Sequence, residues 1–560
     1  MFAIVILICY KLLPYNYLYA QARKTTLPDT SKKTAQKLQP KEEQPKLELP
    51  DVLIYGTDSS VRIFGNKLDR TNEDVKLVAP IIHYQPMTKE LEIENHKGYF
   101  QSQKKCIDSR TILQLDAGRY LQFNIETGRW KEAENYNYSV LGNYERSNGQ
   151  YENSQYYQGS IKAQLGFRLT PNFIISSRGN FRLFEYGLYG AQLNDLQRKI
   201  NGGKIKIDAL WSIATEQSVD FSVYYQQNSC KDGDADNYKS KLVERNIGLF
   251  STYQIKYRSI PIFIRGFYEY QKLNDATIDS ATSQKYLQLK SWLSLKFKQY
   301  FIIKLGILFE NINLSNSFSK YQFSPDIEII ATPTTKLGIV LKGTGGYYPL
   351  NYSNLCEQNP FISHEIHFYP MKKELELKFG IEYNPSSSVS LSSEVFRQNW
   401  KNYAFWSREA KIGLFQLNSF EKIALTIVNF QTRFTITPKL KLDAGVQINF
   451  DQIKDDSLAK SGNHLPYLEK LRFPFNFEFK INETTQALMT FLWIGSRYVR
   501  TTDNEKLSKF GLLSLHFEKQ FYKNISVFVE GNNLLNQKYE FWQNYRGMGF
   551  YFEAGVKGNW

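Results

Sequence analysis

The feature that most constrains this chain is a long, regular alternation of apolar and polar residues. In the segment 471–481 the odd positions carry Leu, Phe or Ile, and the even positions carry Arg, Pro, Asn, Glu and Lys. The segments 287–297, 375–383 and 442–450 repeat the pattern. Because successive side chains of a strand point to opposite faces, each segment predicts a strand with one apolar face and one polar face.

Alternation also occurs in soluble β-sandwiches, so the connections have to distinguish the two folds. The segments are long enough for a tilted membrane crossing, which needs roughly 9 to 11 residues. Short turns around Pro171, Ser259, Pro438 and Lys523 alternate with longer polar loops at 146–155, 229–239 and 451–466. We therefore predict an all-β fold, a transmembrane antiparallel β-barrel of outer-membrane type, with about 20 to 22 strands over residues 111–560.

The composition agrees with such a barrel. The chain of 560 residues has 38 Tyr and 39 Phe, yet its mean hydropathy is −0.44. A wide barrel needs this mixture because each strand has a lipid-facing side and a wet side. The net charge of +15 is spread along the chain without a nucleic-acid-binding module, so we expect no nucleic-acid partner. Basic loops facing anionic lipopolysaccharide, or a basic lumen, explain the charge better.

The N-terminal part predicts export. Residues 2–13 form an apolar stretch too short to span a bilayer, and Ala20-Gln21-Ala22 offers a cleavage site, so residues 1–22 are expected to be a signal peptide. Residues 23–49 are rich in Lys, Pro and Glu, which predicts a disordered periplasmic linker. Residues 50–110 are expected to form a short periplasmic or lumenal segment. The predicted location is the outer membrane, with its lipid, lipopolysaccharide and barrel-assembly machinery as partners.

No grouping of residues predicts catalysis or a cofactor. The chain lacks a Ser/His/Asp order, a phosphate-binding loop and a zinc-protease motif, so we expect no enzyme. His364 and His367 lie close together, but in a strand they would point to opposite faces, so no metal site is predicted.

The four cysteines do not predict a disulfide framework either. Cys9 lies in the apolar leader, and Cys106, Cys230 and Cys356 are odd in number and far apart. This spacing matches neither a disulfide framework nor a zinc motif. A single disulfide is left open, without a predicted pair.

Two segments, 401–406 and 539–545, concentrate Tyr, Phe and Trp at predicted strand ends. One interpretation is an outer surface that binds a sugar, a siderophore or a peptide. The other is the aromatic girdle that membrane barrels carry at the lipid–water interface. Because the clusters occur where strands leave the membrane, we favour the girdle.

The C-terminal end carries a more specific pattern. The motif residues are Asn533, Leu534, Asn536 and Tyr539, and the final strand presents Phe550, Phe552, Val556 and Trp560 on one face. This end resembles that of TonB-dependent outer-membrane receptors, and the segments 143–157 and 374–405 are similar to an early loop and to mid-barrel strands of that family. A terminal aromatic residue is also a barrel-assembly signal shared by unrelated barrels.

The resemblance implies transport of a solute across the outer membrane, energised by TonB through a plug domain in the barrel. Residues 50–110 are too short for a full plug. An alternative function therefore stays open: a plugless barrel that is a structural, assembly or secretion subunit of an outer-membrane complex with another envelope protein. The sequence does not identify the substrate.

Overall fold

A computed structural model of the chain describes residues 108–560 except 192–194, 215, 234–237, 259, 276–279, 298–299, 316–317, 365, 367–369, 409–412, 455–463 and 502–503. The predicted signal peptide, the linker and residues 50–107 lie outside the described residues, as do Cys9, Cys106 and His367.

The described residues form one antiparallel sheet of 22 strands, which matches the upper end of the predicted number. Two small two-stranded pairs, β20–β21 and β24–β25, lie in connections. The strands of the large sheet are β1 (Asp108–Gly118), β2 (Gln122–Glu132), β3 (Tyr136–Ser147), β4 (Tyr156–Thr170), β5 (Phe173–Gly187), β6 (Gln197–Ala214), β7 (Gln217–Gly233), β8 (Tyr238–Tyr257), β9 (Ile260–Asp275), β10 (Ser280–Phe297), β11 (Phe301–Leu314), β12 (Phe318–Thr334), β13 (Leu337–Tyr348), β14 (Met371–Ser386), β15 (Val389–Arg408), β16 (Phe415–Thr437), β17 (Leu440–Ile453), β18 (Leu471–Asn482), β19 (Thr485–Ile494), β22 (Phe510–Tyr522), β23 (Ile525–Asn532) and β26 (Tyr551–Asn559). The other elements are η4 (Arg119–Leu121), α2 (Tyr352–Gln358), β20 (Arg497–Tyr498), β21 (Lys506–Leu507), β24 (Glu540–Trp542) and β25 (Tyr545–Arg546).

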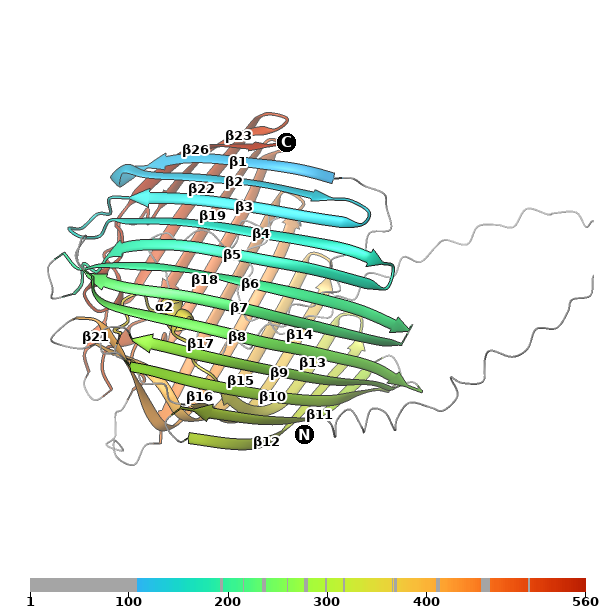
Figure 1. The fold of residues 1–560 in the computed structure, drawn as a ribbon. Helices are drawn as coiled ribbons and strands as arrows, with labels where there is room; N and C mark the ends of the chain where they lie inside the picture. The colour runs from blue at the N-terminus through green and yellow to red at the C-terminus, as the bar shows by residue number, and fades with distance from the viewer. Residues whose placement is uncertain are drawn as a thin grey trace, which may run out of the picture. The chain divides into compact units, whose positions relative to one another are not determined.

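The sheet closes on itself through its first and last strands. β1 pairs with β26 over a register that runs from Ile112–Asn559 to Gly118–Glu553, and Figure 1 shows the two strands side by side. Thr111 and Trp560 exchange two backbone hydrogen bonds of 2.7 and 2.9 Å. No edge strand of the large sheet is left with an unpaired row of backbone groups, which is what closure achieves in a barrel.

The apolar faces point outward. In β14, Leu377 and Phe379 are 50% and 41% exposed, whereas the intervening Glu376 and Lys378 are 5% and 7% exposed. The alternation seen in the sequence is therefore that of a barrel with an apolar exterior and a polar interior. Among the described residues, no helix is both long enough and apolar enough to cross a membrane.

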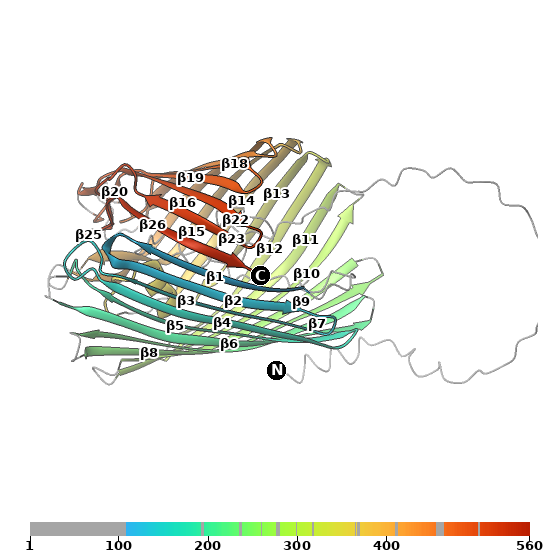
Figure 2. The same ribbon diagram turned by 90° about the horizontal axis from the view of Figure 1, so that it is seen from above.

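The two ends of the barrel differ. One end, the turn end, carries short connections, and the predicted turns at Pro171, Pro438 and Lys523 each join two strands there. Ser259, in the fourth predicted turn, lies outside the described residues. The other, the loop end, carries the long connections, with β20 and β25 lying there in Figure 2. Two predicted boundaries shift: β7 extends to Gly233, so the loop expected over 229–239 is shorter, and β1 begins at Asp108 rather than residue 111.

The described residues of the connection between β13 and β14, which are 349–364, 366 and 370, fold back into the barrel, and we call them the inserted loop (Figure 1). Its helix α2 begins at an N-cap, Asn351, whose side chain accepts the N–H of Asn354 at 2.9 Å. Glu244 of β8 accepts the N–H groups of Tyr352 at 2.6 Å and Ser353 at 3.1 Å. A barrel-wall carboxylate thus satisfies the free donors at the positive end of the helix.

Candidate ligand site at the loop end of the barrel

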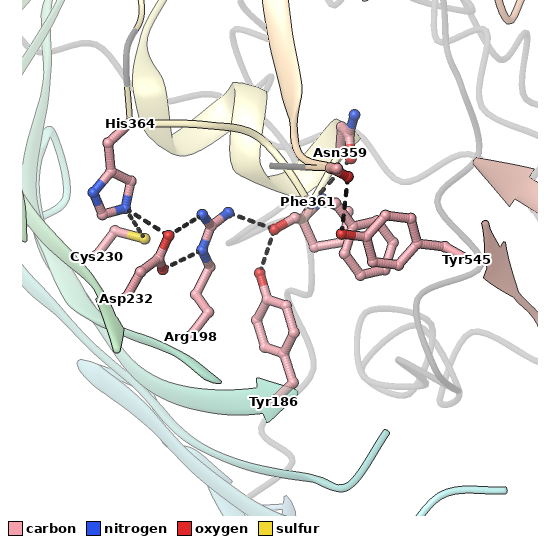
Figure 3. Close-up of polar contacts among 10 residues, drawn as sticks. Tyr186, Arg198, Cys230, Asp232, Asn359, Phe361, His364 and Tyr545 are labelled. Atoms are coloured by element: carbon pink, nitrogen blue, oxygen red, sulfur yellow. Dashed lines mark hydrogen bonds and ion pairs between the residues drawn. The ribbon is translucent and has the colours of Figure 1, made fainter. Parts of the chain in front are cut away.

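A buried ion pair fixes the inserted loop to the barrel wall. Arg198 of β6 is fully buried and binds Asp232 of β7 through two hydrogen bonds, Nε–Oδ1 at 2.6 Å and Nη2–Oδ2 at 2.5 Å. Its Nη1 donates to the Pro360 carbonyl oxygen at 2.6 Å, and the Tyr186 hydroxyl donates to the same oxygen at 2.6 Å. Figure 3 shows both donors converging on this carbonyl. The loop is therefore held by charge-assisted bonds, which are stronger than neutral ones.

Four side chains meet beside this anchor, and we call them the thiol–imidazole cluster: Cys230, Asp232, Cys356 and His364. His364 Nε2 lies 3.3 Å from Cys230 Sγ and 3.4 Å from Asp232 Oδ2 (Figure 3). Cys230 and Cys356 are free thiols that are both buried in the same cluster of residues. Burial disfavours a charge on His364, but the Asp232 carboxylate and the Cys230 thiol outweigh it and raise the pKa of the imidazole.

This arrangement corrects the expectation for the histidines. His364 lies in the inserted loop and not in a strand, so the argument from opposite strand faces does not apply to it. The sequence contained no signal for the grouping, because Cys230 and His364 are 134 residues apart and only the return of the loop into the barrel joins them.

Aromatic side chains from strand ends and connections pack together at the loop end. We call this set the aromatic cluster: Tyr186, Tyr189, Phe361, Trp406, Phe415, Tyr467, Trp542 and Tyr545. Phe361 stacks on Tyr545 with ring centroids 3.5 Å apart (Figure 3), and Trp542 packs against Phe415 and Tyr467 at 5.1 and 4.9 Å. Offset and edge-to-face pairs of this kind add to the free energy of area burial.

The favoured interpretation of segments 401–406 and 539–545 as a lipid-facing girdle is therefore wrong. Trp406 and Trp542 are 0% and 2% exposed and pack within the protein. A girdle and an inward-packed cluster have the same composition and the same position at strand ends, so only the inward fold of the loops separates them. The competing interpretation, an outer surface that binds a sugar, a siderophore or a peptide, stays a prediction.

A pocket opens into the aromatic cluster. Its walls come from the ends of β4 and β5 and from the β3–β4, β5–β6, β13–β14 and β23–β26 connections: Gly149, Tyr151, Ser154, Tyr156, Phe184, Tyr186, Gly187, Tyr189, Phe361, Tyr539, Phe541, Trp542, Tyr545, Arg546, Gly547 and Met548. Burial raises the pKa values of the Tyr539 and Tyr545 hydroxyls well above the usual range of tyrosine, so both hydroxyls stay protonated. Aromatic faces with a few hydroxyl groups and one guanidinium are typical of a small-molecule site.

The free volume of this pocket is about 50 Å³, enough for a few water molecules. Sites for drug-sized ligands occupy about 300–1,000 Å³. The pocket as described is therefore smaller than a site that encloses a ligand of that size.

The predicted motif residues shape the connection that carries this pocket wall. Asn533 donates to the Gln537 and Met548 carbonyls at 2.9 and 3.0 Å, and accepts the Gln537 N–H at 3.0 Å. Asn533 and Asn536 both have φ of +46°, in the left-handed region that Asn tolerates better than most residues. Tyr539 is buried against Phe541. The motif thus folds the chain toward the β24–β25 pair.

The remaining predicted residues lie in or beside this last part of the barrel. Leu534 donates its N–H to the Leu513 carbonyl at 2.8 Å. Phe550 immediately precedes β26, and Phe552, Val556 and Trp560 point outward with about half of each side chain exposed. The motif and the outer face of β26 therefore lie apart from the thiol–imidazole cluster and belong to the frame of the barrel.

Solved structures share this fold. The copper transporter OprC has a TM-score of 0.65 at 12% identity, over 82% of this chain and 81% of that one. The iron transporter FrpB from Neisseria meningitidis gives 0.67 at 10% identity, over 81% and 83%. An enterobactin-bound mutant of the ferric enterobactin receptor PfeA from Pseudomonas aeruginosa gives 0.63 at 13% identity, over 82% of both chains. No protein-family model matches the sequence, and no curated protein matches it.

The barrel therefore has the fold of the TonB-dependent outer-membrane receptors, the family that the C-terminal motif resembles. At these identities the likeness establishes the fold of the chain.

Proposed function

We propose that the protein transports a solute across the outer membrane and recognises it at the aromatic pocket. The apolar exterior of a closed 22-stranded barrel fits a bilayer, and the protein is inserted there in contact with lipid and lipopolysaccharide. The observation that carries the proposal is the packing of the inserted loop against the aromatic cluster at the loop end. A simple diffusion pore of this width would have an open lumen.

Closure at the loop end makes transport dependent on a ligand. Phe361 belongs to the loop that is pinned through Pro360, and Tyr545 belongs to the β24–β25 pair. A ligand that separates these two stacked rings would compete with them for the same aromatic faces. Binding energy would then drive the opening, because a ligand shifts a conformation only through its differential affinity.

The solved structures that share the fold suggest candidate solutes. They include transporters of copper and iron and a ferric enterobactin receptor. Metal ions and their organic chelates are therefore the first compounds to test. TonB or another envelope protein would supply the energy for release into the periplasm.

An uptake assay in a deletion strain tests the proposal. Wild-type protein is expected to restore accumulation of at least one radiolabelled metal or metal chelate, and the double variant Phe361→Ala/Tyr545→Ala to bind that solute at least tenfold more weakly. Phe521→Ala, an outward-facing aromatic of β22 that is 59% exposed, is the matched control and should transport normally. Unchanged uptake of every solute in the deletion strain would count against transport.

A further inference from the structure

We propose that the thiol–imidazole cluster binds a tetrahedral divalent metal ion, with Zn²⁺ as the chemical class, and that this ion fastens the inserted loop to the barrel wall. The ligands are Cys230 Sγ, Cys356 Sγ, His364 Nε2 and Asp232 Oδ2. One ligand atom from each of Cys230, Asp232 and His364 already lies within 4.8 Å of the other two. The proposed site belongs to the arrangement in which the inserted loop contacts the barrel wall, and it does not depend on which solute is transported.

The distances match the edges of a zinc tetrahedron. With bonds of about 2.3 Å to sulfur and about 2.0–2.1 Å to nitrogen and oxygen, a sulfur and a nitrogen ligand lie about 3.5 Å apart, and a nitrogen and an oxygen ligand about 3.3 Å. The observed separations are 3.3 Å between Cys230 Sγ and His364 Nε2, and 3.4 Å between His364 Nε2 and Asp232 Oδ2. These two separations need to change by only a few tenths of an ångström.

The donor set selects the ion. Thiolate and imidazole ligands favour Zn²⁺ and its analogues, whereas Mg²⁺ and Ca²⁺ require oxygen ligands in larger number. Cys356 of α2 is a free thiol buried in the same cluster of residues as Cys230. It completes the set by moving toward the three ligand atoms that already lie together.

The charges of the bound ion and of its ligands balance, which matters because the ligands are buried. Cys230, Asp232 and His364 are all buried, so an uncompensated charge there would be costly. Binding follows M²⁺ + 2 RSH → M(SR)₂ + 2 H⁺: two sulfur–metal bonds form, and two protons leave to solvent. The two thiolates neutralise the metal ion, and Arg198 neutralises Asp232. With Arg198 counted and His364 in its neutral form, the net charge is therefore zero before and after binding. An imidazole that is protonated beforehand releases a third proton to solvent when Nε2 binds the metal.

The ion would join three elements that are distant in sequence. Cys230 and Asp232 come from β7, Cys356 from α2, and His364 from the segment that follows Phe361. The same loop carries the aromatic ring that stacks on Tyr545. Metal binding would stabilise the closed arrangement because it adds bonds that exist only when α2 and β7 are together.

Metal analysis of the full chain, purified without a histidine tag and with its thiols reduced, tests the site. After equilibration with Zn²⁺ and removal of free metal, we expect about one ion per chain. Replacement by Co²⁺ should give the thiolate charge-transfer absorption and the intense visible bands of a tetrahedral site. Asp232→Asn should weaken binding by about 10- to 100-fold, and Cys230→Ser/Cys356→Ser should abolish it, while His516→Gln of β22 should bind normally.

A second measurement works on the wild-type chain if the double variant does not fold. Zn²⁺ should protect Cys230 and Cys356 from alkylation by a maleimide, and a chelator should restore the reaction. Absence of stoichiometric metal in the reduced, folded protein would overturn the proposal. The proposal would also be overturned if protein isolated from the outer membrane contained a Cys230–Cys356 disulfide that does not exchange for metal.

Discussion

At the scale of single residues, two ion pairs of similar length have different consequences. Arg198 and Asp232 are withdrawn from water and share the loop carbonyl of Pro360. Lys256 and Glu216 form a pair of 2.5 Å at the turn end with both side chains more than 40% exposed. Breaking a buried pair leaves a charge without a partner or a solvent shell, whereas an exposed pair exchanges its partner for water.

We therefore predict that Arg198→Met destabilises the folded barrel by about 3–5 kcal/mol, because Asp232 keeps its buried charge without the guanidinium. Lys256→Ala should change stability by less than about 1 kcal/mol. Urea unfolding of protein refolded in lipid vesicles, followed by tryptophan fluorescence, measures both values. Arg198→Met/Asp232→Leu should recover part of the loss. Equal midpoints for Arg198→Met and Lys256→Ala would contradict the anchoring role.

At the scale of elements, the inserted loop shows where prediction from sequence ends. Strands such as β10, β14, β17 and β18 were predictable because a period of two is local and needs no partner to be recognised. The loop depends instead on contacts such as Glu244–Tyr352 and Arg198–Pro360, which are 108 and 162 residues apart in sequence. Its helix is short, and its N-cap Asn351 gives only a weak local signal.

Glu244→Gln is predicted to loosen α2 while the barrel stays intact, because the amide keeps the shape of the carboxylate but loses its charge at the helix N-terminus. Hydrogen exchange of residues 352–358 should become faster, with the strands β6 to β9 unchanged, as mass spectrometry of the folded protein would show. Glu216→Gln, at the turn end, is the matched control. Unaltered exchange in α2 would mean that other contacts hold the helix.

At the scale of the whole molecule, the outward apolar side chains define how the barrel meets its surroundings. Phe379 lies near the middle of β14, and Leu169 lies one residue from the turn that follows β4; both are more than 40% exposed. The class of fold was readable from the sequence because this exterior follows from alternation. The arrangement of the interior was not readable from the sequence, because charged and aromatic residues give the same pattern whether they face water, lipid or the inserted loop.

The position of the bilayer gives a depth-dependent prediction. Phe379→Arg should lower the free energy of unfolding by about 2–4 kcal/mol, and Leu169→Arg by only about 0–1 kcal/mol. The difference arises because a guanidinium at the midplane lies in hydrocarbon, whereas one near the interface can reach water. Unfolding of the two variants from lipid vesicles by urea measures the difference. Equal costs would show that β14 does not cross the bilayer at Phe379.

The pairing of β1 with β26 also sets the order of assembly. Each other pair of neighbours in the large sheet consists of strands that follow one another along the chain, but β1 also needs the last strand, β26, which has nine residues. Until β1 and β26 pair, two open edges can recruit other chains, and the most distant pairing in the sequence is the slowest to form. Pairing of β1 with β26 therefore completes the barrel, and a chain without β26 has a sheet that lacks its closing strand.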